Sequence, residues 1–219
     1  LETTDSLAAE VLDEIRKTAP DDIRGQLDDN IHWIREAGRN RLVVGSQARI
    51  LYADCEGRTQ IALGFNKAIR EGRLKAPVVL GRDHHDVSGT DSPFRETSNI
   101  RDGSNVMADM AVQCFAGNAA RGMSLCALHN GGGVGIGKAI NGGFGLVLDG
   151  SERVDGIIRS AMSWDVMGGV ARRSWARNAH GMETAMDYNS RRANEGHITI
   201  PYIVNDGIIE KAVADKMNK

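Results

Sequence analysis

Cysteine, proline and net charge are all scarce in this sequence. Its 219 residues include three cysteines and four prolines, and 27 basic against 29 acidic residues give a net charge of −2. Cys55, Cys114 and Cys126 are too few and too far apart for a disulfide framework or a CxxC metal site, which favours a reducing compartment. The balanced charge supplies no field that would attract nucleic acid or an anionic membrane. We therefore expect no nucleic-acid partner.

Long apolar runs are also missing. The longest contain about six residues, too few for a transmembrane helix, and the first five residues lack the charged and apolar regions of a signal peptide. We therefore expect no membrane partner. Because the chain starts without methionine and enters a helical pattern at once, we treat it as a possible fragment of a longer protein.

The sequence does contain a regular alternation of helical and strand-like patterns. Apolar residues at helical spacing predict a helical pair in residues 1–40. Short apolar runs predict strands at 48–53, 77–80, 124–128, 144–148 and 198–203. Helices are expected at 61–69, 104–121, from 151, at 169–193 and at 206–217. The alternation predicts one α/β domain over 1–219, a helical lead (1–40) and a core (41–219) with a mostly parallel sheet flanked by helices on both faces.

Residues 82–105 form a long polar segment directly after a predicted strand. Open α/β sheets hold ligands at the carboxyl ends of their strands, and long connections in compact domains are usually functional. The segment includes Asp83, His84 and Arg95, whose side chains suit proton transfer and anion binding. A solvated surface loop with internal ion pairs is the alternative. His84 and His85 would point to opposite sides of an extended chain, which argues against a shared metal.

Eight of the 26 glycines lie between residues 131 and 145. In the run Gly131, Gly132 and Gly133, backbone N–H groups can approach an anion or a flat ring, which side chains would block. A tight strand connection is the alternative interpretation. A P-loop from Gly132 to Lys138 is incomplete because Ala139 replaces the hydroxyl residue that holds Mg²⁺, so nucleotide hydrolysis ranks last. His129, just before the glycines, suits either an acid/base role or a structural one.

The motifs 81–97 and 128–135 together resemble the carboxyl-terminal part of the urocanase family, in its animal-type branch. The resemblance extends through Ser163-Trp164-Asp165 and residues 169–173. It implies a lyase of histidine degradation that hydrates urocanate to 4-imidazolone-5-propanoate, with NAD⁺ as an electrophile, in a cytoplasmic homodimer. The amino-terminal and Rossmann domains of the family have no counterpart in this sequence, so we expect the chain alone to be inactive.

The resemblance also implies roles for particular residues. It places the cofactor contact on Gly131, Gly132 and Gly133, most specifically on Gly133. We assign proton transfer and water orientation to Asp83, His84 and His129, and the binding of a substrate carboxylate or a cofactor phosphate to Arg95. Leu51 stands where many bacterial members have an active-site cysteine, which argues against a cysteine-based mechanism. A non-catalytic dimerisation or assembly domain is the alternative function.

Overall fold

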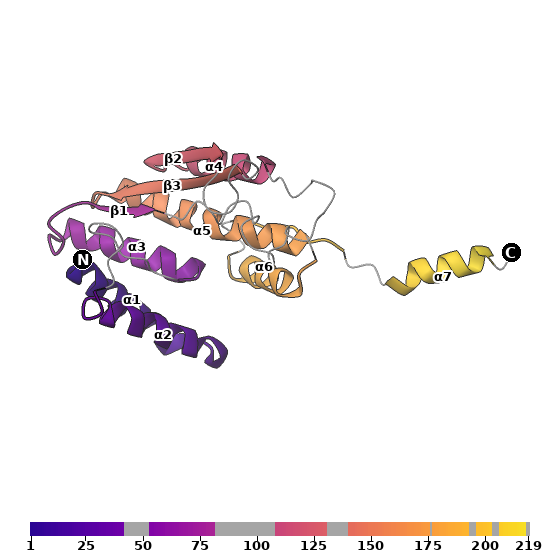
Figure 1. Ribbon diagram of the computed structural model, residues 1–219, viewed down its shortest axis with the longest axis horizontal. Helices are drawn as coiled ribbons and strands as arrows, with labels where there is room; N and C mark the ends of the chain where they lie inside the picture. Colours follow the sequence, from indigo (N-terminus) through magenta and orange to yellow (C-terminus); the bar gives the residue numbers. More distant parts are fainter. Residues whose placement is uncertain are drawn as a thin grey trace. The chain divides into compact units, whose positions relative to one another are not determined.

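A computed structural model describes residues 1–41, 53–81, 108–130, 140–175, 177–192, 196–202 and 206–217. Figure 1 shows the helices and strands that these ranges contain, in chain order. They are α1 (Glu2–Thr18), α2 (Asp21–Glu36), α3 (Cys55–Arg70), β1 (Val78–Gly81), α4 (Ala108–Ala120), β2 (Leu125–Asn130), β3 (Ile140–Leu148), α5 (Glu152–Trp175), α6 (Ala179–Arg191) and α7 (Asp206–Met217). Contacts divide the chain into a first unit, Leu1–Val166, and a second unit, Met167–Lys219.

The prediction of a mostly parallel sheet is wrong for the described part of the chain, which is mostly helical. Its sheet has three strands in the order β1-β3-β2, and both neighbours of β3 are antiparallel to it. Nine residues separate β2 from β3, and a parallel connection needs a crossover of about a dozen residues or more, so this linker favours an antiparallel pair. The strands β1 and β2 do run in the same direction, but β3 lies between them.

The core of the first unit explains why the predicted helices form. Leu7 and Leu12 of α1 and Ile31 and Ile34 of α2 recur at helical spacing and are all buried. They belong to one cluster that also includes the following residues of later elements: Phe65, Leu146, Leu148, Val154 and Ile158. The helical lead therefore shares its core with the sheet and with α3 and α5.

The sheet has one covered face and one open face. Val78, Leu80 and Cys126 pair with Leu148, Leu146 and Phe144, and these pairs turn toward the core. On the opposite face, Val79, Leu125 and Val147 are 67%, 61% and 39% exposed. Alternation along each strand thus places an apolar strip on the open face.

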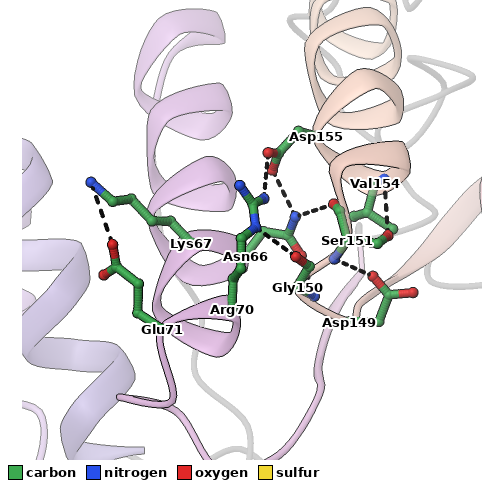
Figure 2. Close-up of polar contacts among 9 residues, drawn as sticks. All are labelled: Asn66, Lys67, Arg70, Glu71, Asp149, Gly150, Ser151, Val154 and Asp155. Atoms are coloured by element: carbon green, nitrogen blue, oxygen red, sulfur yellow. Dashed lines mark hydrogen bonds and ion pairs between the residues drawn. The ribbon is translucent and has the colours of Figure 1, made fainter.

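A buried polar network fastens the turn between β3 and α5 to α3 (Figure 2). The Asn66 Oδ1 accepts from the Gly150 N–H at 2.8 Å, and Asn66 Nδ2 donates to Ser151 O at 2.9 Å and to Asp155 Oδ1 at 2.6 Å. Arg70 Nε donates to Gly150 O at 2.7 Å, and Arg70 also forms an ion pair with Asp155. Gly150 has φ +85°, a conformation that favours glycine. The turn is therefore specified by backbone and side chains together.

This network is expected to make stability depend on acid pH. Partial burial raises the pKa of Asp155. Hydrogen bonds from Asn66 and Arg70 lower the pKa by a larger amount, so it lies below the ordinary value of about 3.9. A depressed pKa adds stability above the unfolded-state value, and this stability is lost as pH falls through the folded-state pKa. We expect Asp155→Asn to flatten the acid limb of unfolding free energy against pH. Urea melts from pH 7 down through the carboxylate range measure it, and an unchanged limb would contradict the assignment.

The second unit is held by side-chain bonds around α6. The Asn178 side chain caps α6 by accepting from the Gly181 N–H at 2.8 Å, and buried Ser174 Oγ donates to Gly181 O at 2.7 Å. Asn189 bonds both the N–H and the C=O of Ile198, at 2.7 and 2.8 Å. Because Ile198 is paired with a side chain in this way, residues 198–202 form no strand, and the predicted strand there is wrong.

The described helices include none with the length and apolar content needed to span a membrane.

Candidate functional site

Most of the predicted site residues lie outside the described residues. These are Asp83, His84, Arg95, Gly131, Gly132 and Gly133, together with Leu51. The exception is His129, whose backbone lies in β2 and pairs with Asn141 of β3. The described residues therefore include none of the predicted side chains, and only the elements that adjoin them in the sequence can be placed.

The described elements that adjoin these ranges can be placed along the sheet. β1 and β2 run in the same direction, but across Gly145 of β3 the end of β1 is level with Leu125, the first residue of β2, so β2 continues five residues past β1. The two strands finish at Gly81 and Asn130. Ranges 82–107 and 131–139 continue from these two residues. We call the end at which β2 finishes and β3 begins the carboxyl end of the sheet.

Helices α3 and α4 both begin near the same end. Arg70 of α3 pairs with Asp155, near the start of α5, whereas Arg58 of α3 pairs with Asp165, farther along α5, so the two helices are antiparallel. In α4, Gly117 lies beside Trp164, whereas the following Gly122 lies beside Ile157, so α4 is also antiparallel to α5. Because α5 runs back along the sheet from the end of β3, the starts of α3 and α4 lie near the carboxyl end of the sheet.

An ion pair with a buried carboxylate joins α3 to α5 there. The carboxylate side chain of Asp165 is 1% exposed, and its Oδ2 lies 3.7 Å from Nη1 of Arg58. Arg58 Nε also donates to Ala53 O at 2.8 Å. Arg58 therefore links Ala53, the first residue described after the range 42–52, to α5. Since pairing offsets part of the cost of burying a charge, this contact helps to fix the start of α3.

A stacked cation lies on the other side of α5. The guanidinium carbon of Arg121 is 4.2 Å from the centroid of the Trp164 ring, and Nη1 donates to Gly117 O at 3.1 Å. Gly117 permits this arrangement, because a Cβ at that position would collide with the indole. A rigid ring and a helix carbonyl thus fix the plane of the guanidinium group.

Asn118 adds a buried amide to this cluster. The residue is fully buried, and its Nδ2 donates to Cys114 Sγ at 3.4 Å. Within the described ranges, Asn118 Oδ1 and Arg121 Nε are buried and have no hydrogen-bond partner. Unpaired buried polar atoms cost free energy, so this cluster is incomplete without a further group.

The three cysteines are free thiols, and burial raises the pKa of Cys126. No group of three or more His, Cys, Asp or Glu side chains in the described residues is arranged to hold a metal. A cavity of about 410 Å³ between α1 and α2, lined by residues that include Glu2, Asp5, Glu10 and Asp13, contains none of the predicted site residues. The buried polar groups that α3 and α4 direct at α5 are therefore the better candidates for function.

Sequence reasoning identified only part of this arrangement. Trp164 and Asp165 belonged to a motif of the family resemblance, but Arg58, Asn118 and Arg121 were not identified. A buried Asn in a helix and an Arg near a helix end carry no local signal of function, because their role depends on residues of another helix. The contact between Gly117 and Trp164 would have pointed to this cluster, but it is recognisable only in the folded structure.

Comparisons with known proteins agree with the motifs. The urocanase C-terminal domain family matches residues 1–187. The chain is 58% identical to the urocanate hydratase of Homo sapiens over 210 residues, covering 94% of this chain and 30% of that protein. It is 56% identical to the urocanate hydratase of Mus musculus over 208 residues, covering 94% of this chain and 30% of that protein. Identity is 50% over 214 residues to the probable urocanate hydratase of Dictyostelium discoideum, covering 95% of this chain and 31% of that protein.

The chain thus spans about a third of the length of these relatives. The family match extends over most of the sequence and includes both motifs and all the elements of the first unit. On this evidence, the chain belongs to the urocanase C-terminal domain family.

Proposed function

We propose that this chain is the carboxyl-terminal domain of an enzyme of histidine degradation, a urocanate hydratase that adds water to urocanate and yields 4-imidazolone-5-propanoate. The observation that carries the proposal is that three described element ends lie near the carboxyl end of the sheet, namely the starts of α3 and α4 and the end of β2. Ranges 42–52, 82–107 and 131–139 adjoin these three elements in the sequence, and they contain the position of Leu51, the polar motif and the glycine motif. The names of the relatives support the choice of substrate.

The chemistry assigns distinct tasks to the residues of this chain. Hydration needs a proton donor to the side chain of the substrate and a group that delivers water to its ring. In this proposal Asp83, His84 and His129 carry out these proton and water steps. Arg95 binds the substrate carboxylate or a cofactor phosphate through its planar fork.

NAD⁺ is the proposed cofactor, and Gly131, Gly132 and Gly133 would hold it through backbone N–H groups. When bound, it supplies an electron-accepting ring. Among the described residues, Arg121 offers a cation to an anionic group. It lies between the end of α4 and the start of β2, and its buried Nε has no partner within the described ranges. The chain's own part is to bind, to orient and to exclude water around the reacting ring.

Gly133→Val in the full-length protein is expected to reduce cofactor retention more than folding. A branched side chain disfavours positive φ and occupies the space in which the backbone would approach the cofactor, at a local cost of about 1–3 kcal/mol. NAD⁺ content per purified subunit and the thermal midpoint of cofactor-free protein measure the two effects. Gly38→Val is the matched control, because nothing lies within 4 Å of a Cβ at Gly38. Unchanged NAD⁺ content with a large fall in the midpoint would show that the glycines serve packing.

A non-catalytic assembly domain is the second candidate, and the open face of the sheet favours it. Val79, Leu125 and Val147 form an exposed apolar strip there, and exposed strips of this kind commonly mark interfaces. In the proposed cytoplasmic homodimer, the same strip would form the interface between the two subunits. Light scattering of the chain with and without NAD⁺ separates the two functions: a dimer that ignores NAD⁺ supports assembly alone, and NAD⁺ binding supports the enzyme.

A further inference from the structure

Arg121 is a half-buried cation, and its contacts among the described residues are with the Trp164 ring and Gly117 O rather than with an acidic side chain. Its ring stacking and its Nη1 bond to Gly117 O leave the opposite edge, formed by Nε and Nη2, without a hydrogen bond in that part of the chain. This edge is the fork with which arginine binds carboxylate or phosphate groups in a bidentate way. Because Nε is buried, the group that completes the fork must be enclosed beside it rather than be bulk solvent.

Asn118 lies in the last turn of α4, three residues before Arg121, which directly follows the helix and whose N–H still bonds to Gly117 O. Its Nδ2 bonds to the Cys114 sulfur, and its Oδ1 has no hydrogen-bond partner in the described ranges. Since a thiol both donates and accepts, exchanging the amide oxygen and nitrogen keeps the Cys114 contact and leaves Nδ2 as the unpaired donor. In that orientation, the unpaired donors of Asn118 and Arg121 would serve the same acceptor.

We propose that Arg121 and Asn118 bind one anionic oxygen group of a small ligand. The group is a carboxylate or a phosphate, and the inference rests on the proposed function only for the choice of probes. In that enzyme a carboxylate comes from urocanate and a phosphate from the dinucleotide. Trp164 is a positioning residue in this site, because its ring holds the guanidinium plane and does not contact the anion.

The test is a titration of the ¹⁵N-labelled 219-residue chain, followed on the side-chain Nε–H signal of Arg121. Sodium pyrophosphate and urocanate are added in separate experiments at constant ionic strength. We expect a saturable shift of this signal with at least one probe. A shift with pyrophosphate alone assigns the site to a nucleotide phosphate, and a shift with urocanate alone assigns it to the substrate carboxylate.

Four variants make the result specific. Arg121→Met should abolish the binding, and Arg121→Lys, which keeps the charge but loses the fork, should weaken it at least tenfold. Asn118→Asp should also weaken it at least tenfold, because the new carboxylate supplies an internal counter-ion. Arg153→Met, which removes an exposed arginine of α5, should leave the affinity within twofold.

No saturable shift with either probe would overturn the proposal, as would unchanged affinity in Asn118→Asp or in Arg121→Lys. Thermal melts identify any variant that fails to fold, and if Arg121→Met does not fold, the two conservative variants decide the question. Because the signal reports binding at Arg121 and not turnover, a negative result would leave the proposed hydration of urocanate to be judged by its own assay.

Discussion

Gly117→Ala is expected to lower the free energy of unfolding by about 3 kcal/mol. The new methyl group would lie inside van der Waals contact of Trp164 atoms Cε2, Nε1 and Cζ2, and neither the ring nor the helix backbone can yield without repacking. Displacement of the indole would also remove the surface on which Arg121 stacks. Urea unfolding monitored by circular dichroism measures the stability.

The same substitution at another helical glycine provides the control. Gly156 lies in α5 of the same unit, and a Cβ there would have nothing within 4 Å. Gly156→Ala should therefore stabilise the protein by about 0.5–1 kcal/mol, because alanine has the higher helix propensity. Equal effects at Gly117 and Gly156 would show that Trp164 does not pack against α4 as described.

Asn66→Ala is expected to cost about 3–4 kcal/mol. Asn66 is fully buried, and its amide provides the hydrogen-bond partner of the buried Gly150 N–H. The substitution leaves that N–H unsatisfied and also removes the bonds to Ser151 O and Asp155 (Figure 2). Chemical unfolding at neutral pH measures the loss.

Asn178→Ala is the matched control for this prediction. Asn178 accepts a single hydrogen bond, from Gly181 N–H at the start of α6, so its loss should cost only about 1 kcal/mol. If Asn66→Ala lowered the free energy of unfolding no more than Asn178→Ala, the hydrogen bonds around Gly150 would not stabilise the contact between α3 and α5 as the structure indicates.

The helices could be predicted from the sequence because their pattern is local. Leu7, Leu12, Ile31 and Ile34 recur on one face of each helix, and burial of that face is what stabilises α1 and α2. Ser151 marked the start of α5 in the same way, and its Oγ accepts from the Val154 N–H. Each of these signals lies within a few residues of the element that it predicts.

Strand direction could not be predicted with the same success. The runs at 124–128 and 144–148 correctly indicated β2 and β3, but alternation with helices was interpreted as evidence of a parallel sheet. The decisive feature was the short linker between the two strands, which is too short for a crossover. Contacts such as Asn66 with Gly150, 84 residues apart, depend on the finished fold and leave no local pattern.

The candidate site likewise has parts that local sequence motifs predicted and parts that only the folded structure revealed. The family resemblance identified the motifs at 81–97 and 128–135, and family membership is now shown by the match over residues 1–187. The roles of Asp83, His84, Arg95 and His129 stay predictions, because the structure describes only the backbone of His129. Arg121 and Asn118 became candidates only because each has a buried polar atom with no partner among the residues that the structure describes.

The central claim is that this chain forms part of a urocanate hydratase, and the most direct test is the loss of urocanate absorbance in the presence of NAD⁺. The measurement compares the full-length protein that contains this chain with its Gly133→Val variant and with the 219-residue chain alone. The account predicts turnover by the full-length protein, at least a tenfold loss in the variant, and none by the chain alone. A full-length, NAD⁺-loaded protein that leaves urocanate unchanged would contradict it.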